Sequence, residues 1–361
     1  MRTAILFGGR SGEHDVSCAS ATSVLRHIDR TQFEPIAIGI DRNGAWYVQS
    51  LPDAAQLSDS SFRLEVTPSS ETAVVFDPVH GLIAGGRNLA IEAVFPVLHG
   101  TFGEDGTVQG LLELLNLPYV GSGVLGSSLS MDKHLTKQMW EHHGLPIVPY
   151  LTLHAVDYYS RPDHWIHEIE NSLGIPAFIK PARGGSSVGV YKAHDQAELR
   201  EAIQGAFRFD SKVLVEQSIT AIEVECSVLG NSNPTAFEPA SIEPSHEYYD
   251  YEAKYNDPDG AHFNIPAKIP PAITSRIQTT AVKAFRAGEA RGLSRVDFFY
   301  CPDSNRLYLN EINTMPGFTA ISLFPRMCEY SGIPYAELIN TLIGYAVEEH
   351  KLRNSLLYTW Q

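Results

Sequence analysis

The sequence RVDFFYCPDSNRLYLNEINTMPG, residues 295–317, carries the strongest indication of fold and chemistry in the chain. Its two apolar runs, residues 294–299 and 307–310, predict a pair of neighbouring strands. Polar and acidic side chains interrupt or follow these runs. A buried carboxylate without a partner is costly, so acids in such places need a chemical reason.

That reason is metal binding. Glu311 and Asn313 are alternate residues of one predicted strand and therefore project from the same face. Asp297, on the neighbouring strand, completes a set of oxygen donors, which suits Mg²⁺ that bridges nucleotide phosphates. The alternative is a strand edge with scattered polar groups, and the cost of burying unpaired acids favours the metal site.

Two further segments fit a nucleotide site. In FIKPARGGSSVGV, residues 178–190, Lys180 ends an apolar strand and a Gly/Ser loop follows, whose N–H groups can hold phosphate. A flexible hairpin with a solvated lysine explains that segment equally well. In VLVEQ, residues 213–217, Glu216 ends another strand and Glu223 follows, so these acids could read adenine and ribose. Taken alone, that segment fits an ordinary strand end with surface acids better.

A fourth segment lies near the start of the chain. GGRSGEHD, residues 8–15, places Glu13 at the carboxyl end of the first predicted strand, where α/β proteins usually bind ligands. A carboxylate there could hold an ammonium group. Capping of the next helix by Ser11 or by the acids explains the segment equally well.

Strands and helices alternate in the pattern of a parallel α/β layer. Strands are predicted at residues 3–7, 33–40, 93–98, 177–180 and 212–216, and helices at 15–27, 107–115, 129–143, 195–207, 273–289 and 335–349. Residues 50–90 receive no assignment. Residues 244–264, rich in Tyr, Asp and Pro, predict a long surface loop, and a loop of that length is usually functional.

A dinucleotide fingerprint is not supported. GSGVLG, residues 121–126, matches G-x-G-x-x-G, but a lone match is weak and a tight turn explains it better. The chain also lacks a G-x-x-x-x-G-K-[ST] phosphate loop, so any ATP must be held in another way.

Composition excludes other classes of protein. The net charge of −15 disfavours nucleic acid and anionic lipid as partners. The four cysteines are far apart in the sequence, which gives neither a zinc spacing nor a dense disulfide framework. With no signal peptide and no apolar run of about 18 residues, a cytoplasmic protein without membrane partners is expected.

Together these segments resemble the D-alanine–D-alanine ligase family of the ATP-grasp superfamily. The resemblance runs from Gly8 to about Ser331. Seven segments carry it, in this order: GGRSGEHDVS, LHGTFGEDGTVQG, LPYVGSGVLGSSLSMDK, IKPARGGSSVGV, VLVEQ, YDYEAKY and RVDFFY…LNEINTMPGFTAISL.

The resemblance implies an α/β fold of three-domain ATP-grasp architecture with an N-terminal Rossmann-like domain. We expect an N-terminal substrate domain over residues 1–128, a central ATP-grasp subdomain over 129–218, and a C-terminal one over 219–361. The third would carry the metal site and the 244–264 lid. A homodimer is also implied.

The resemblance implies roles for residues at the nucleotide. Lys133 and Lys180 would contact phosphates, Glu216 and the backbone after it would read adenine, and Glu223 would hold the ribose. Lys254 would add positive charge at the transferred phosphate. The other implied ATP-binding residues are Ser187, Gln217 and Phe299. The metal triad would bind two Mg²⁺ ions, with Mn²⁺ as an alternative.

At the amino-acid substrates, the resemblance places Glu13 near the ammonium group of the first D-alanine, with His99 in a nearby loop. Ser322 and Leu323 would hold the carboxylate of the second D-alanine. The implied oxyanion stabilisers are Arg295 and the Gly317 N–H, and the pair that links the lid to Glu13 is Ser186 with Tyr255.

The implied reaction joins two D-alanine molecules through an acyl phosphate made from ATP, for peptidoglycan precursor synthesis. The alternatives are D-lactate or D-serine as second substrate, another ATP-grasp carboxylate–amine ligase, or an inactive nucleotide-binding module. Tyr255 favours D-alanine, because relatives that make D-alanine–D-lactate usually lack tyrosine there.

Overall fold

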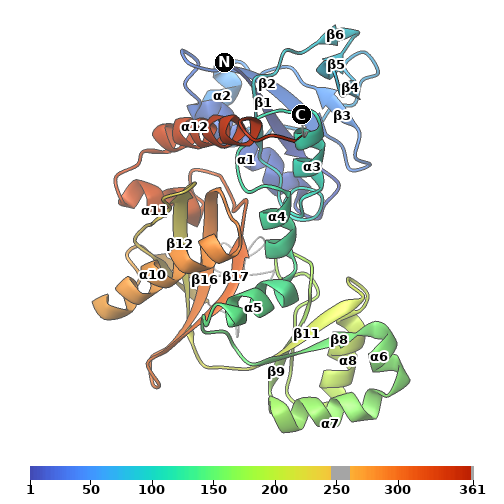
Figure 1. Cartoon of the computed structure of the whole chain (residues 1–361), viewed down its shortest axis with the longest axis vertical. Coiled ribbons are helices and arrows are strands. Elements are labelled where there is room, and N and C mark those ends of the chain that lie inside the picture. The colour runs from blue at the N-terminus through green and yellow to red at the C-terminus, as the bar shows by residue number, and fades with distance from the viewer. Residues whose placement is uncertain (245–260, 359–361) are drawn as a thin grey trace.

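The computed structural model describes residues 1–244 and 261–358. Its first sheet has the order β3-β2-β1-β7, in which β1 pairs in parallel with β2 and β7. Helix α1 follows β1 at the carboxyl edge of this sheet (Figure 1). Strands β2, β1 and β7 form the parallel α/β layer predicted from the sequence, while the edge strand β3 pairs with β2 antiparallel. The elements are β1 (Arg2–Gly8), α1 (His14–His27), β2 (Glu34–Ile40), β3 (Trp46–Val48), β7 (Ala93–Pro96) and α3 (Thr107–Leu114).

Residues 50–90, left unassigned from the sequence, hold one short helix and a small antiparallel sheet of order β4-β5-β6. Asp53 caps the start of the helix, because its side chain accepts a hydrogen bond from Gln56 N while the Gln56 side chain accepts one from Asp53 N in a capping box. The elements are α2 (Ala54–Ser58), β4 (Val74–Asp77), β5 (Gly81–Ala84) and β6 (Arg87–Asn88).

The helix predicted over 129–143 is wrong in one respect: it is two helices, α4 (Val124–Met131) and α5 (Lys133–His142). Asp132 separates them because its backbone is extended and its side chain accepts a 3.1 Å hydrogen bond from Leu135 N, which caps α5. Gly121, in the dismissed fingerprint, has φ +103 in the turn before α4.

The second sheet is antiparallel, of order β10-β9-β11-β8, and its helices pack on one side (Figure 1). Its core joins Ile166, Ile179, Leu199 and Val213. The elements are β8 (Tyr150–His154), α6 (Ala155–Ser160), α7 (Pro162–Ser172), β9 (Ala177–Pro181), β10 (Tyr191–Ala193), α8 (Gln196–Ala206) and β11 (Lys212–Gln217).

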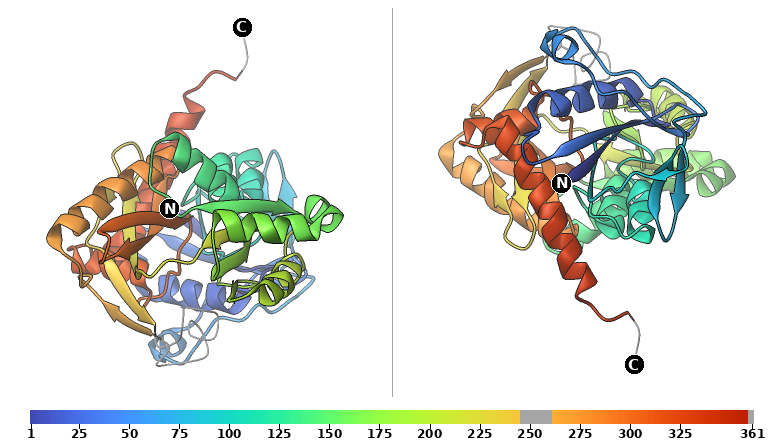
Figure 2. Two further views of the ribbon diagram at one scale, coloured as in Figure 1. Left: turned by 90° about the horizontal axis from the view of Figure 1, so that it is seen from below. Right: turned by 90° about the horizontal axis from the view of Figure 1, so that it is seen from above.

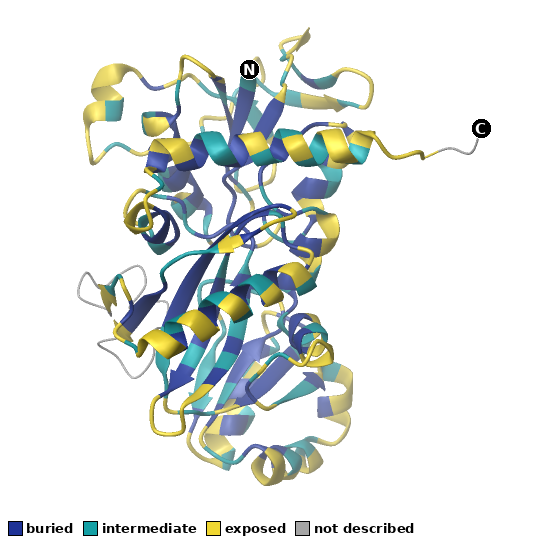
Figure 3. Ribbon diagram, turned by 60° about the vertical axis from the view of Figure 1, so that its left-hand side comes forward, coloured by how far each residue is buried: buried dark blue, intermediate teal, exposed yellow. Residues whose placement is uncertain are grey.

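The third sheet has the order β15-β14-β12-β16-β17, with β13 beside β12. Helix α10 packs one buried face against this sheet, and the opposite face of the helix is exposed (Figure 3). The elements are β12 (Ile222–Gly230), β13 (Thr235–Ala236), β14 (Ala240–Pro244), β15 (Ala261–Asn264), α10 (Pro271–Ala287), β16 (Gly292–Cys301), β17 (Arg306–Asn313) and α11 (Leu323–Tyr330).

The prediction of a loop throughout residues 244–264 is wrong at both ends. Pro244 ends β14 and pairs with Ala261 of β15, and Ser241 pairs with Asn264. Backbone hydrogen bonding to β12 and β14 therefore extends the sheet into the predicted loop.

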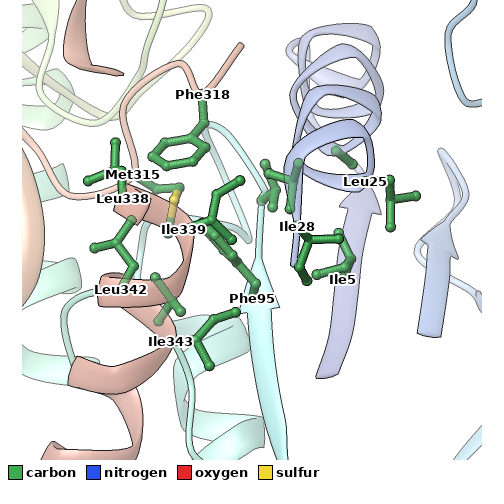
Figure 4. Close-up of a cluster of buried hydrophobic side chains, with 14 of the residues drawn as sticks. Ile5, Leu25, Ile28, Phe95, Met315, Phe318, Leu338, Ile339, Leu342 and Ile343 are labelled. Atoms are coloured by element: carbon green, nitrogen blue, oxygen red, sulfur yellow. The ribbon is translucent and has the colours of Figure 1, made fainter. Parts of the chain in front are cut away.

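The last helix, α12 (Tyr335–Asn354), packs against the first sheet. Its Leu338, Ile339, Leu342 and Ile343 share one buried cluster whose other members include Ile5, Leu25, Phe95, Met315 and Phe318 (Figure 4). The C-terminal helix thus joins the first sheet to the loop after β17. Residues 355–358 run away from the body of the molecule (Figure 2). In residues 1–244 and 261–358, no helix combines the length and apolar character that crossing a bilayer requires.

Candidate active site

The three predicted metal ligands converge on adjacent antiparallel strands. Asp297 of β16 pairs directly with Glu311 of β17, and a bulge follows between Asp297 and Phe298. Asn313 Nδ2 donates to Asp297 Oδ2 at 3.0 Å. The predicted metal site consists of two carboxylates and one amide. Within the part of the chain that the structure describes, no three His, Cys, Asp or Glu side chains form a metal-binding group.

Cationic side chains border these carboxylates. Arg295 binds Asp297 in a bidentate pair, with Nε–Oδ1 at 2.8 Å and Nη2–Oδ2 at 2.7 Å, and its Nε lies 3.0 Å from Glu225 Oε2. Lys133 Nζ is 3.3 Å from Glu311 Oε2. Burial lowers the pKa of Arg295, but Asp297 and Glu225 outweigh it and raise that pKa well above its usual range. Arg295 is therefore a fixed positive charge.

Glu216 lies between two lysines. Its Oε2 is 2.7 Å from Lys180 Nζ, and its Oε1 is 3.0 Å from Lys137 Nζ. Lys180 Nζ also donates to Asn310 Oδ1 at 3.2 Å. Burial alone would raise the pKa of Glu216, but the two ammonium groups outweigh it and lower the pKa, so the carboxylate is ionised.

A cavity of about 230 Å³ lies between the second and third sheets. Its charged end holds Lys133, Asp297 and Glu311, while Phe178, Val190 and Phe299 supply apolar wall. A cavity with apolar walls and an end lined by lysine and carboxylate groups suits a nucleotide. The other predicted ATP-site residues among its lining are Lys180, Ser187, Glu216, Gln217 and Glu223.

Glu13 is cradled by backbone and by one hydroxyl. Ser186 Oγ donates to Glu13 Oε1 at 2.5 Å, from a residue with φ +52, a left-handed conformation that non-glycine residues rarely adopt. A Cβ added at Gly100 would lie 2.5 Å from Glu13 Oε2, and one at Gly185 would lie 2.8 Å away. These glycines allow two loops to close around the carboxylate.

A second cavity, of about 220 Å³, begins at Glu13. It meets the first at Arg295, Glu225, Glu311 and Ser186, which line both. The other predicted substrate-site residues among its lining are His99, Asn313, Gly317, Ser322 and Leu323. A group held in one cavity can therefore react with a group held in the other beside the Arg295 guanidinium.

Helix α1 and His99 anchor the loop that carries Gly317. His99 Nδ1 lies 2.9 Å from Met315 O, and because a carbonyl only accepts, this nitrogen carries the proton. His99 Nε2 then accepts from Ser20 Oγ at 3.0 Å, and Ser20 Oγ accepts from Phe318 N at 3.3 Å. Burial lowers the pKa of His99, although the charge of Glu13 opposes the shift, so the neutral ring is favoured.

Comparison with known proteins decides the family. The model described as D-ala D-ala ligase N-terminus matches residues 2–122, and the one described as D-ala D-ala ligase C-terminus matches residues 139–344. The chain belongs to the D-alanine–D-alanine ligase family.

Named relatives of this family cover nearly the whole chain. A D-alanine–D-alanine ligase of Treponema denticola is 45% identical over 99% of this chain and 98% of its own. One of Solibacter usitatus is 46% identical, with 97% of each chain covered.

Solved structures of the family share the fold. The D-alanine-D-alanine ligase of Coxiella burnetii has a TM-score of 0.83 at 33% identity, and the match covers 98% of this chain and 97% of that one. The VanG D-Ala:D-Ser ligase of Enterococcus faecalis has a TM-score of 0.83 at 36% identity, with 96% of this chain and 99% of that one covered. The ATP-grasp architecture predicted from the sequence is therefore confirmed.

Of the residues that the family resemblance singled out, only Lys254 and Tyr255 lie outside the described residues. All the others line the two cavities.

Sequence reasoning missed three residues of the site. Glu225 stands two positions after Glu223 on the same strand, which the alternation of β12 could have revealed. Lys137 stands one helical turn after Lys133. Glu104 accepts from Gly100 N at 2.7 Å, and burial with the charge of Glu13 raises the pKa of Glu104 to about 8. Glu104 lies in the loop LHGTFGEDGTVQG, and only its acidic side chain could have indicated from the sequence that it belongs to the site.

Proposed function

We propose that the chain joins two D-alanine molecules to D-alanyl-D-alanine with release of ADP and phosphate, for peptidoglycan precursor synthesis. The observation that carries this proposal is the meeting of two cavities at Arg295 and Glu311. One cavity has the apolar walls and charged groups that a nucleotide needs, and the other is bounded by a carboxylate suited to an ammonium group. The family membership of the chain supports the same reaction.

In this proposal ATP occupies the cavity between the second and third sheets. Lys133 and Lys180 neutralise its phosphates, with the N–H groups of the loop around Ser187. Glu216, together with the backbone at Gln217, reads the adenine, and Glu223 holds the ribose. Phe299 contributes apolar wall, and Lys254 adds charge near the transferred phosphate.

Asp297, Glu311 and Asn313 would hold the divalent cations. Their oxygens fit Mg²⁺, and also Mn²⁺, because both prefer carboxylate and amide oxygen ligands. Bound there, two such ions would neutralise charge on the β- and γ-phosphates. The Lys133 ammonium group, 3.3 Å from Glu311, lies on the same side.

The two amino acids occupy the second cavity. Glu13 holds the ammonium group of the first D-alanine, and His99 keeps the adjoining loops in place. Ser322 and Leu323, at the start of α11, hold the carboxylate of the second. Arg295 and the Gly317 N–H stabilise the oxyanion that forms between them.

The reaction has two steps. A carboxylate oxygen of the first D-alanine attacks the γ-phosphorus of ATP, and ADP leaves, which creates an acyl phosphate. The uncharged amine of the second D-alanine then attacks the acyl carbon, and the tetrahedral intermediate expels inorganic phosphate as the amine loses its proton. Water would hydrolyse the acyl phosphate, and the lid that the family resemblance implies, with Ser186 and Tyr255, would exclude it. Most of that segment, including Tyr255, lies outside the described residues.

The proposal extends to partners and location: a homodimer in the cytoplasm that binds neither nucleic acid nor membrane. D-serine is a competing second substrate, since a structural relative is a D-Ala:D-Ser ligase. D-lactate is the other alternative. An inactive nucleotide-binding module is the remaining alternative.

The deciding experiment measures phosphate release from ATP with D-alanine, L-alanine, D-serine or D-lactate, and identifies the product by mass spectrometry. D-alanine should support turnover and yield the dipeptide, while L-alanine should not. Turnover only in mixtures containing D-serine or D-lactate would reassign the second substrate. If no D-amino acid supports ATP turnover, the chain is an inactive nucleotide-binding module.

A further inference from the structure

Lys137 is a buried lysine behind the nucleotide cavity. Burial lowers the pKa of its ammonium group, and the charge of Glu216 opposes that shift. It stands one helical turn after Lys133 on α5, and its side chain is 0% exposed. Its Nζ lies 3.0 Å from Glu216 Oε1 and 5.7 Å from the centroid of the Tyr150 ring. Burying an ammonium group costs several kcal/mol unless a carboxylate compensates. Glu216 is that carboxylate, so the positions of the two groups depend on each other.

Lys137 and Lys180 differ in where they approach Glu216. Lys180 lines the cavity and also contacts Asn310, the residue before Glu311, so it lies toward the charged end. Lys137 is absent from the cavity lining and faces the other carboxylate oxygen. A bound nucleotide can draw Lys180 toward its phosphates. Lys137 does not line the cavity, so it stays beside Glu216 as the counterion of that carboxylate.

We propose that Lys137 is a positioning residue that keeps Glu216 ionised and oriented, so that this carboxylate selects ATP over GTP. The inference rests on the proposed function, in which Glu216 faces the nucleobase. It assigns nucleobase selectivity to an ion pair formed behind the cavity wall.

The selectivity follows from hydrogen-bond chemistry. An ionised carboxylate only accepts, and adenine offers a donor in its exocyclic amino group. Guanine presents the O6 acceptor at the corresponding position, where two acceptors repel. A protonated Glu216 could instead donate to O6. Burial favours that neutral form, and the ammonium groups of Lys137 and Lys180 oppose it by lowering the pKa of Glu216.

The test is the ratio of kcat/KM for ATP to kcat/KM for GTP, with saturating D-alanine and Mg²⁺. Lys137→Met should lower this ratio about tenfold or more, through a higher KM for ATP and a gain with GTP. The ratio is independent of the fraction of active enzyme, so partial unfolding cannot imitate the effect. Lys137→Gln repeats the test with a polar side chain should Lys137→Met fail to fold.

Two further variants identify the route. Glu216→Gln should lower the ratio in the same direction, and Lys137→Met combined with Glu216→Gln should lower it no further than Glu216→Gln alone. Lys212→Met is the matched control. Lys212 is another largely buried lysine, paired at 2.5 Å with Asp132, which caps α5, but it does not contact Glu216. Its loss should leave the ratio unchanged.

An unchanged ratio in folded Lys137→Met or Lys137→Gln would overturn the inference. It would also be overturned if the double variant lowered the ratio by the full product of the two single effects, because Lys137 would then act independently of Glu216. A fall of the same size in Lys212→Met would also overturn it, because any disturbance of α5 would then suffice. Failure of the proposed function is a separate result: the unmodified enzyme would show no D-alanine-dependent turnover with ATP.

Discussion

Replacing Glu225 by glutamine should slow the chemical step while leaving substrate binding nearly intact. Arg295 lies between two carboxylates, 3.0 Å from Glu225 and 2.7 Å from Asp297. Asp297 is also a proposed metal ligand, so bound cations would compete with Arg295 for its negative charge. Glu225 would then be the main carboxylate that holds the Arg295 guanidinium in place. Glu225→Gln removes the charge of Glu225 with little change in shape.

The size of the effect follows from the burial of the pair, whose side chains are 20% and 9% exposed. Removing one partner of a buried ion pair costs about 3–5 kcal/mol when no other counterion remains. Arg295 retains Asp297, so we expect a smaller loss, about 2 kcal/mol. If this loss falls on the transition state, kcat should drop roughly 30-fold, since each 1.36 kcal/mol is tenfold.

The assay is phosphate release at saturating ATP and D-alanine, with KM for each substrate and the free energy of unfolding measured alongside. Glu243→Gln is the matched control, because Glu243 forms an exposed ion pair with Lys268 at 3.2 Å and exposed pairs contribute little. The control should keep its kcat. A kcat for Glu225→Gln within twofold of the unmodified enzyme, or a change confined to KM, would refute the reasoning.

Three other predictions concern the same site. Ser20→Ala leaves His99 and Phe318 N without their buried partner, so the free energy of unfolding should fall by about 2 kcal/mol in urea titrations and KM for D-alanine should rise; unchanged values would contradict the anchoring role. The pKa of Glu104, raised from 4.5 to about 8, makes its contribution to stability complete below pH 4.5 and lost as pH rises to about 8. Urea titrations of Glu104→Gln should therefore show a weaker fall in stability over that range, and an identical slope would count against it. Chelation of divalent ions should abolish phosphate release. Asp297→Asn should raise the Mg²⁺ concentration that gives the half-maximal rate about tenfold or more. Phosphate release that persists in the chelated enzyme without added metal would exclude the metal site.

Local sequence was sufficient for two neighbouring strands of the third sheet. The apolar runs around Asp297 and before Glu311 predicted β16 and β17, and the two-residue period placed Glu311 and Asn313 on one face. The family resemblance added roles that no period or spacing could supply, such as those of Ser322 and Gly317. Local rules were less reliable at Asp132, where a capping side chain divides one predicted helix into two.

The sequence by itself therefore determined the strands β1, β2, β7, β9, β11, β16 and β17, several of the helices and the oxygen donors, because these depend on residues a few positions apart. Only the tertiary structure decided that α12 packs on the first sheet, that Ser20 supports the loop of Gly317, and that Lys137 lies behind Glu216. Each of these contacts joins residues tens to hundreds of positions apart. No local propensity encodes such a pairing, since its free energy comes from burying both partners together when the chain folds.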